Sequence, residues 1–125
     1  MTEPQFEITK AAAFDAAHRL PQGGPDGSPY TRTHGHSFQV EASVRGAETP
    51  PVGWVTDLAG LEAALKAAAG ELDHSLLNDH PGLESPTLEH LCLWFAGRLK
   101  PQFPGLCRVV VSRPTIGERC ALTVA

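Results

Sequence analysis

The 125-residue sequence lacks three features, each of which would point to a particular class of protein. It has no apolar run long enough to span a bilayer, and its first ten residues lack the hydrophobic core of a secretion signal. It has no cluster of basic residues, and its net charge of -4 disfavours nucleic acid and acidic lipid surfaces as partners. These absences predict a cytoplasmic protein that has neither a membrane nor a nucleic acid as its partner.

Cysteine is also scarce, because only Cys92, Cys107 and Cys120 occur and no two of them form a C-x-x-C pair. This uneven spacing does not suit a disulfide framework, and it favours a reduced compartment. Free cysteines are commonly buried, so we expect three small apolar thiols in the interior. No cysteine precedes residue 92, and this absence limits the chemistry discussed below.

The chain shows no internal repeat, which predicts a single domain over residues 1–125. Apolar and polar side chains alternate over 36–45, as in a half-buried antiparallel strand. Six elements are expected in all. The four strands cover residues 6–17, 36–45, 106–112 and 120–125. One helix is capped by Thr56 or Asp57 and stops at Gly70, and the other opens at Ser85, with Pro86 in its first turn, and ends at Pro101. The order β-β-α-α-β-β predicts an α+β fold, with a four-stranded antiparallel sheet and two helices on one face. Its bare edges favour the joining of subunits edge to edge.

Three histidines lie where the first two strands flank a long loop over residues 21–33. His34 and His36 are two residues apart and point to one face, and His18 ends the preceding strand. Three imidazoles at one corner with a fourth position open form the ligand set of a catalytic zinc, although imidazole also suits other divalent ions. The alternative is a pair of exposed histidines, with His18 capping the loop.

A fourth histidine, His74, directly follows Asp73 in the irregular stretch ELDHSLLNDHPGLES. An adjacent carboxylate can fix the tautomer of a histidine and tune its pKa, which suits acid–base chemistry. The alternative is a polar loop that merely caps the helix that follows.

Several segments occur together in the order and spacing of a known family: FDAAHRL, THGHSFQVEASVRG, GWVTDLAGL, LDHSLLND, SPTLEHL and VVVS. Over essentially its whole length the sequence resembles the 6-pyruvoyltetrahydropterin synthase / 6-carboxytetrahydropterin synthase family. It looks most like the bacterial branch, which makes 6-carboxytetrahydropterin for queuosine biosynthesis. The resemblance implies the tunnelling fold, whose subunits join through their sheets into a barrel. It also implies a homo-oligomer, a trimer or hexamer, with active sites at subunit interfaces.

The resemblance further implies roles for individual residues. The three zinc ligands of the family fall on His18, His34 and His36, and the implied substrate is 7,8-dihydroneopterin triphosphate. A cysteine of the long loop acts as base in the family, assisted by a pair that corresponds to Asp73 and His74. A position beside the pterin pocket corresponds to Thr87.

Two positions depart from the family pattern. Tyr30 stands where the catalytic cysteine is expected, and a phenol can replace it in acid–base work, with Asp26 of the same loop as another substitute. Arg113 stands where a glutamate grips the pterin, and it offers only donors. Glu118 can take over that grip, Arg113 can itself select an anionic or carbonyl-bearing ligand, or the two can form a salt bridge at a subunit interface.

The sequence therefore supports three hypotheses about function. The first is a zinc-dependent lyase that acts on dihydroneopterin triphosphate or a related pterin-like or purine-derived substrate. The second is a diverged homologue that binds a different, anionic small molecule without the family reaction. The third is a purely structural oligomer in which the histidines are incidental.

Overall fold

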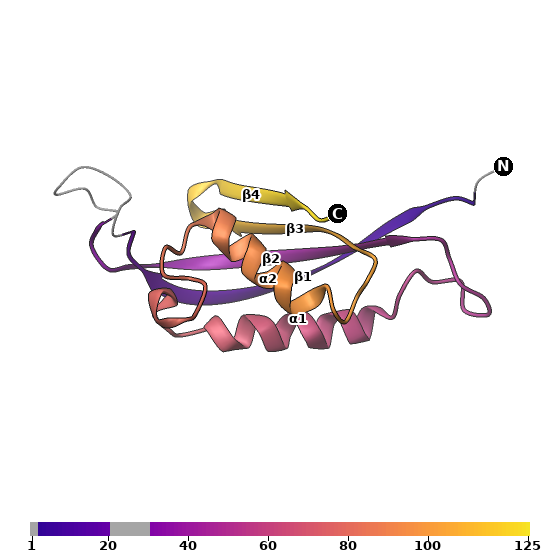
Figure 1. The fold of residues 1–125 in the computed structure, drawn as a ribbon, viewed down its shortest axis with the longest axis horizontal. Coiled ribbons are helices and arrows are strands. Elements are labelled where there is room, and N and C mark those ends of the chain that lie inside the picture. The colour runs from indigo at the N-terminus through magenta and orange to yellow at the C-terminus, as the bar shows by residue number, and fades with distance from the viewer. Residues whose placement is uncertain (1–2, 21–30) are drawn as a thin grey trace.

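A computed structural model describes residues 3–20 and 31–125 of the chain. The element order is β-β-α-α-β-β with two short 3-10 turns, as predicted: β1 Phe6–His18, β2 His34–Gly46, α1 Leu58–Leu72, η2 Leu77–Asp79, α2 Leu88–Leu99, β3 Leu106–Arg113, η3 Pro114–Ile116 and β4 Glu118–Thr123. The strands form one antiparallel sheet in the order β1-β2-β3-β4. Helix α1 packs against β1, and α2 packs against β3 and β4 (Figure 1).

The core lies between the helices and one face of the sheet. The alternation predicted for β2 is confirmed, because Phe38, Val40, Ala42 and Val44 are all buried. Phe38 stacks on Phe14 of β1 with ring centroids 5.0 Å apart. Buried aliphatic side chains of both helices complete this layer: Leu61, Leu65, Leu72, Leu91 and Leu99. The same sheet face continues, at the end where β1 stops and β2 starts, into the histidines.

Two helix boundaries differ from the sequence expectation. Asp57 caps α1 as predicted, but the helix continues beyond Gly70 to Leu72, whose side chain is fully buried. Packing of this last turn outweighs the cost of about 1 kcal/mol for a glycine in a helix. Helix α2 is capped by Thr87, rather than opening at Ser85 with Pro86 in its first turn, because the Thr87 hydroxyl accepts the backbone N–H of His90.

The burial of the cysteines and the edges of the sheet complete the description of the fold. Cys92 is buried as expected, whereas Cys107 on the inner strand β3 and Cys120 on the edge strand β4 are only half-buried; all three are free. Strands β1 and β4 form the two edges of the sheet. In the part of the chain that the structure describes, neither helix is long and apolar enough to cross a membrane.

Candidate metal centre

Strand pairing brings three imidazoles together at one corner of the sheet. His18, the last residue of β1, lies directly opposite His34, the first residue of β2, and His36 follows on the same face. The Nε2 atoms of His18 and His34 are 3.1 Å apart. The candidate ligand atoms of the three residues all lie within 4.8 Å of one another, so one ion can contact them all.

Backbone carbonyls determine which ring nitrogens point inward. Nδ1 of His18 donates to the carbonyl of Pro86 at 3.0 Å, and Nδ1 of His34 donates to the carbonyl of Arg32 at 2.7 Å. A carbonyl only accepts, so each Nδ1 holds a proton, and in the neutral ring Nε2 then presents a lone pair. Two lone pairs that face each other at 3.1 Å cannot bond to one another. This arrangement fits a cation between them, with outer hydrogen bonds of the kind that orient metal-bound histidines.

Burial favours the neutral form of two of these rings, His18 and His36. The pKa of His18 is lowered to about 4, mainly by burial; the Pro86 carbonyl opposes this shift, and the neighbouring His34, His36 and Arg113 add to it. Burial also lowers the pKa of His36, followed by the charge of Arg113. Neutral imidazole is the form that binds a metal ion, so burial leaves His18 and His36 in the form that a metal ion needs.

Asp73 and His74 form a second polar pair, at the outer edge of β1. Nδ1 of His74 lies 2.8 Å from Oδ2 of Asp73, and the other carboxylate oxygen accepts the backbone N–H of Asp15 at 2.9 Å. The hydrogen bond to Asp73 raises the pKa of His74, and the N–H of Asp15 lowers the pKa of Asp73. The His74 side chain is 80% exposed, so its Nε2 is open to a ligand.

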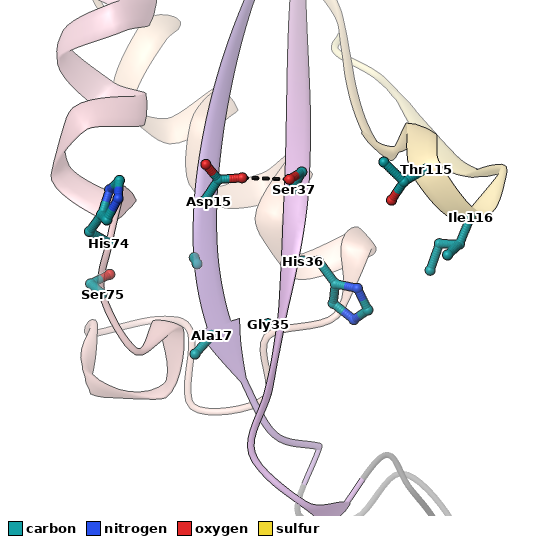
Figure 2. Close-up of a pocket in the computed structure, with 10 residues that line it drawn as sticks. Asp15, Ala17, Gly35, His36, Ser37, His74, Ser75, Thr115 and Ile116 are labelled. Atoms are coloured by element: carbon teal, nitrogen blue, oxygen red, sulfur yellow. Dashed lines mark hydrogen bonds between the residues drawn. The ribbon is translucent and has the colours of Figure 1, made fainter.

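One open hollow of ≈ 710 Å³ is lined by both His36 and His74. Figure 2 shows the two rings on opposite sides of the β1–β2 pair, with the hydrogen bond from Ser37 to Asp15 between them. Within one chain, therefore, the Asp73–His74 pair lies apart from the three-histidine cluster, although His74 and His36 line the same hollow.

Arg113 and Glu118 lie on the other side of His36. Together with Arg32, Thr33, His34 and Ile116 these residues line a hollow of ≈ 490 Å³. Nε of Arg113 lies 2.8 Å from Oε1 of Glu118, so the two residues form an ion pair within one chain. The structure thus places two of the three residues predicted to bind substrate, Arg113 and Glu118, beside the histidines.

The remaining predicted residues divide into two groups. Thr87 lines neither hollow; its hydroxyl caps α2, next to the Pro86 carbonyl that orients His18. Tyr30 and Asp26 lie outside the described residues, so the prediction of a base in this loop stays a prediction.

Sequence reasoning missed the residues that position the corner. The amide of Asn78 forms two hydrogen bonds with the backbone of Arg19, accepting its N–H at 3.0 Å and donating to its carbonyl at 2.9 Å. This clamp fixes the chain directly after His18. Asn78 is the last residue of the LDHSLLN motif, so the motif could have identified it as a candidate. Nothing in the sequence indicates that its partner is the backbone of Arg19.

The family model described as 6-pyruvoyl tetrahydropterin synthase matches residues 7–123. The chain belongs to this family. A 6-carboxy-5,6,7,8-tetrahydropterin synthase of Synechocystis sp. is 39% identical over 113 residues, 83% of each chain. A dihydroneopterin monophosphate aldolase of Pyrococcus furiosus is 33% identical over 98 residues, 78% of each chain.

Solved structures confirm the fold of the 6-pyruvoyl tetrahydropterin synthase family for this chain. The 6-pyruvoyl tetrahydropterin synthase of Caenorhabditis elegans superimposes with a TM-score of 0.84 at 22% identity, over 100% of this chain and 99% of the other. The Plasmodium vivax enzyme gives a TM-score of 0.74 at 16% identity, over 98% and 100%. The tunnelling-fold architecture expected from the sequence is therefore present.

Proposed function

We propose that this member of the 6-pyruvoyl tetrahydropterin synthase family is a cytoplasmic, zinc-dependent lyase that acts on dihydroneopterin triphosphate or a related pterin. The observation that supports it most is the three-histidine cluster, in which two proton-free Nε2 atoms face each other at 3.1 Å. Its relatives include proteins named as a pterin synthase and a pterin aldolase. Zinc is favoured because three neutral histidines with an open fourth position are typical of catalytic zinc.

In this proposal His18, His34 and His36 hold the ion, which when bound supplies Lewis-acid polarisation of substrate oxygens. The chain's own acid–base groups then move the protons. Asp73 holds Nδ1 of His74, and among residues 3–20 and 31–125 no hydrogen-bond partner occupies the Nε2 of that ring. We propose that this nitrogen exchanges a proton with the substrate or with Tyr30 as the base, and that Thr87 lies beside the pterin.

We further propose that the active unit is a homo-oligomer, a trimer or hexamer. Two features of the chain support it. Strands β1 and β4 leave both edges of the sheet available for pairing. The Asp73–His74 pair and the histidine cluster lie on opposite sides of the β1–β2 pair (Figure 2), so a site shared between subunits would bring one chain's pair to another chain's metal.

The test is turnover of dihydroneopterin triphosphate by zinc-loaded protein. The release of acetaldehyde or of a 6-pyruvoyl product measures turnover, and zinc per chain is measured on the same samples. We expect about one zinc per chain, and loss of both zinc and turnover in His34→Ala. His90→Ala is the matched control, because His90 is an exposed histidine on α2 that lines neither hollow at the corner. Zinc-loaded wild-type protein without turnover would remove this activity.

A second candidate function has its own observation, the guanidinium of Arg113 beside His36. In that case the chain binds an anionic small molecule without turnover. The same assay separates the two, because a binding protein would retain zinc and release no product.

A further inference from the structure

We infer that the hollow between the three-histidine cluster and β4 selects a ligand with a carboxylate or phosphate group, and that Arg113 binds this group. The inference deepens the proposed function, since it takes this corner to be the ligand site, and it names the class of ligand. It depends on the position, the partners and the charge of one side chain.

Arg113 continues a row of side chains on the core face of β3. Val109 and Val111 precede it on this face, and both are fully buried. The side chain of Arg113 is only 14% exposed, and its guanidinium carbon lies 5.9 Å from the ring centroid of Phe38. Phe38 also contacts His36 edge to face, with ring centroids 5.7 Å apart. Packing therefore holds the guanidinium next to the histidine cluster instead of releasing it into solvent.

Glu118 faces only one side of the guanidinium. Nε of Arg113 lies 2.8 Å from Oε1 of Glu118, but its N–H is not aligned with that oxygen, so the contact is an ion pair without a good hydrogen bond. Within the described ranges, 3–20 and 31–125, no residue accepts a hydrogen bond from either Nη atom of Arg113. The guanidinium is thus oriented by Glu118 and keeps its terminal donors for a ligand.

The other charges of the hollow add to this preference. Arg32 lines the same hollow, is exposed and, among the described residues, pairs with no carboxylate. Two arginines against one glutamate leave the hollow positive even before a divalent ion is counted. A partly enclosed positive hollow concentrates anions, and the lower dielectric of its walls strengthens the attraction.

Hydrogen-bond chemistry then defines the ligand group. Arginine has donors and no acceptor, and its planar fork matches the two oxygens of a carboxylate or phosphate. A ligand edge made of N–H donors would face the N–H donors of Arg113 and leave both unpaired. The hollow therefore fits an acceptor edge, whereas ring N–H donors would need Glu118 to turn inward.

The experiment compares three-carbon ligands that differ in one group: glycerate with a carboxylate, glycerol 3-phosphate with a phosphate, and neutral glycerol. Neopterin represents a ligand with a donor edge. Each is titrated calorimetrically into zinc-loaded protein at low ionic strength. We expect at least one of the two anions to bind about tenfold or more tightly than glycerol and neopterin, and this preference to weaken with added salt. The stronger of the two anions identifies the group.

Substitutions assign the effect to Arg113. Arg113→Gln should lower the affinity for the preferred anion about tenfold or more, and Arg113→Lys should lower it less, since a single ammonium keeps the charge but not the fork. Arg98→Gln is the matched control, because Arg98 is 49% exposed and pairs with Glu71 on the helical side. Arg113→Glu should reverse the preference in favour of neopterin. Zinc content and a melting curve verify that each variant folds.

Anion affinity that is unchanged in Arg113→Gln, or neopterin that binds wild-type protein as tightly as the anions, would overturn the inference. Its failure can be told apart from failure of the proposed function. Turnover of dihydroneopterin triphosphate without an Arg113-dependent anion preference leaves the lyase standing and removes the inference. Arg113-dependent anion binding without turnover leaves the inference standing and removes the lyase activity.

Discussion

The three-histidine corner and the Asp73–His74 pair use the same side chain for opposite purposes. His18 is 1% exposed, and burial lowers its pKa to about 4. The His74 side chain is 80% exposed, and the carboxylate of Asp73 raises its pKa. Desolvation disfavours the charged ring in the first case, whereas a neighbouring charge favours it in the second. The comparison shows that the surroundings favour the neutral form of one imidazole and the protonated form of the other.

The two sites also differ in what holds them in place. The corner depends on strand register and aromatic packing, with Phe38 in edge-to-face contact with His18 and His36. The exposed pair depends on the backbone, because His74 has a left-handed φ of 57 and its N–H donates to the carbonyl of Asp15. A left-handed conformation costs a non-glycine residue roughly 1–2 kcal/mol, so the contacts to β1 must maintain it. Perturbations of the core should therefore affect one site and spare the other.

The largest expected effect comes from Phe38→Ala, because this fully buried ring supports the corner. We expect a loss of about 3–5 kcal/mol in the free energy of unfolding, measured with urea, together with weaker metal binding. Leu93→Ala, at a residue 57% exposed on α2, is the control and should change stability very little. If Phe38→Ala displaced the pKa of His74 as strongly as it weakened metal binding, the two sites would not be independent.

The next largest effect is a loss of stability in acid that depends on His18. In metal-free protein the folded pKa of His18, about 4, lies below its unfolded value of 6.5, so protons favour the unfolded chain. This contribution to stability is complete above pH 6.5 and is lost as the pH falls toward 4, and it amounts to up to about 3 kcal/mol. Urea unfolding of chelator-treated protein across this range should show a steeper loss in wild type than in His18→Gln. Equal slopes would contradict the assigned environment of His18.

A smaller effect is expected at the start of α2. Thr87→Ala removes the hydroxyl that caps this helix and should lower stability by about 1 kcal/mol, whereas Thr87→Ser should retain the cap. The neighbouring Pro86 carbonyl orients His18, so metal affinity should fall modestly as well. Unchanged stability with a large fall in turnover would instead place Thr87 at the substrate.

The smallest effect is expected at the exposed pair. Asp73→Asn removes the carboxylate that raises the pKa of His74, so this pKa should return downward toward its ordinary value. An NMR titration of the imidazole protons measures the change, and zinc content should be unaffected. A His74 pKa that did not move would mean that another group sets it.

The sequence predicted the fold well because its patterns are local. Alternation over 36–45 and the family motifs defined the element order, and β-strand geometry alone placed His34 and His36 on one face. The antiparallel pairing of His18 with His34 followed from the strand order. The misplaced boundaries at Gly70 and Ser85 reflect tertiary packing and a capping choice between neighbouring hydroxyls, which propensity alone does not resolve.

The groups that tune the site could not be predicted, because most of them are backbone atoms. The carbonyls of Pro86 and Arg32 determine the tautomers of two histidines, and any residue type can supply a carbonyl. The separation of His74 from His36 was also hidden, since it depends on which edge of β1 the loop after α1 follows. Arg113 was identifiable from the sequence as a hydrogen-bond donor, but only the fold shows that packing against Phe38 holds it beside the cluster.

The three nitrogen donors all belong to residues 18–36, whereas the carbonyl that orients His18 belongs to residue 86. During synthesis the three histidines therefore leave the ribosome well before the carbonyl that fixes the proton of His18. An ion captured at that stage would tie together the ends of two strands joined by a long connection and offset part of the entropy of closing it. Arrival of the segment that leads into α2 would then orient the His18 ring toward an ion already in place.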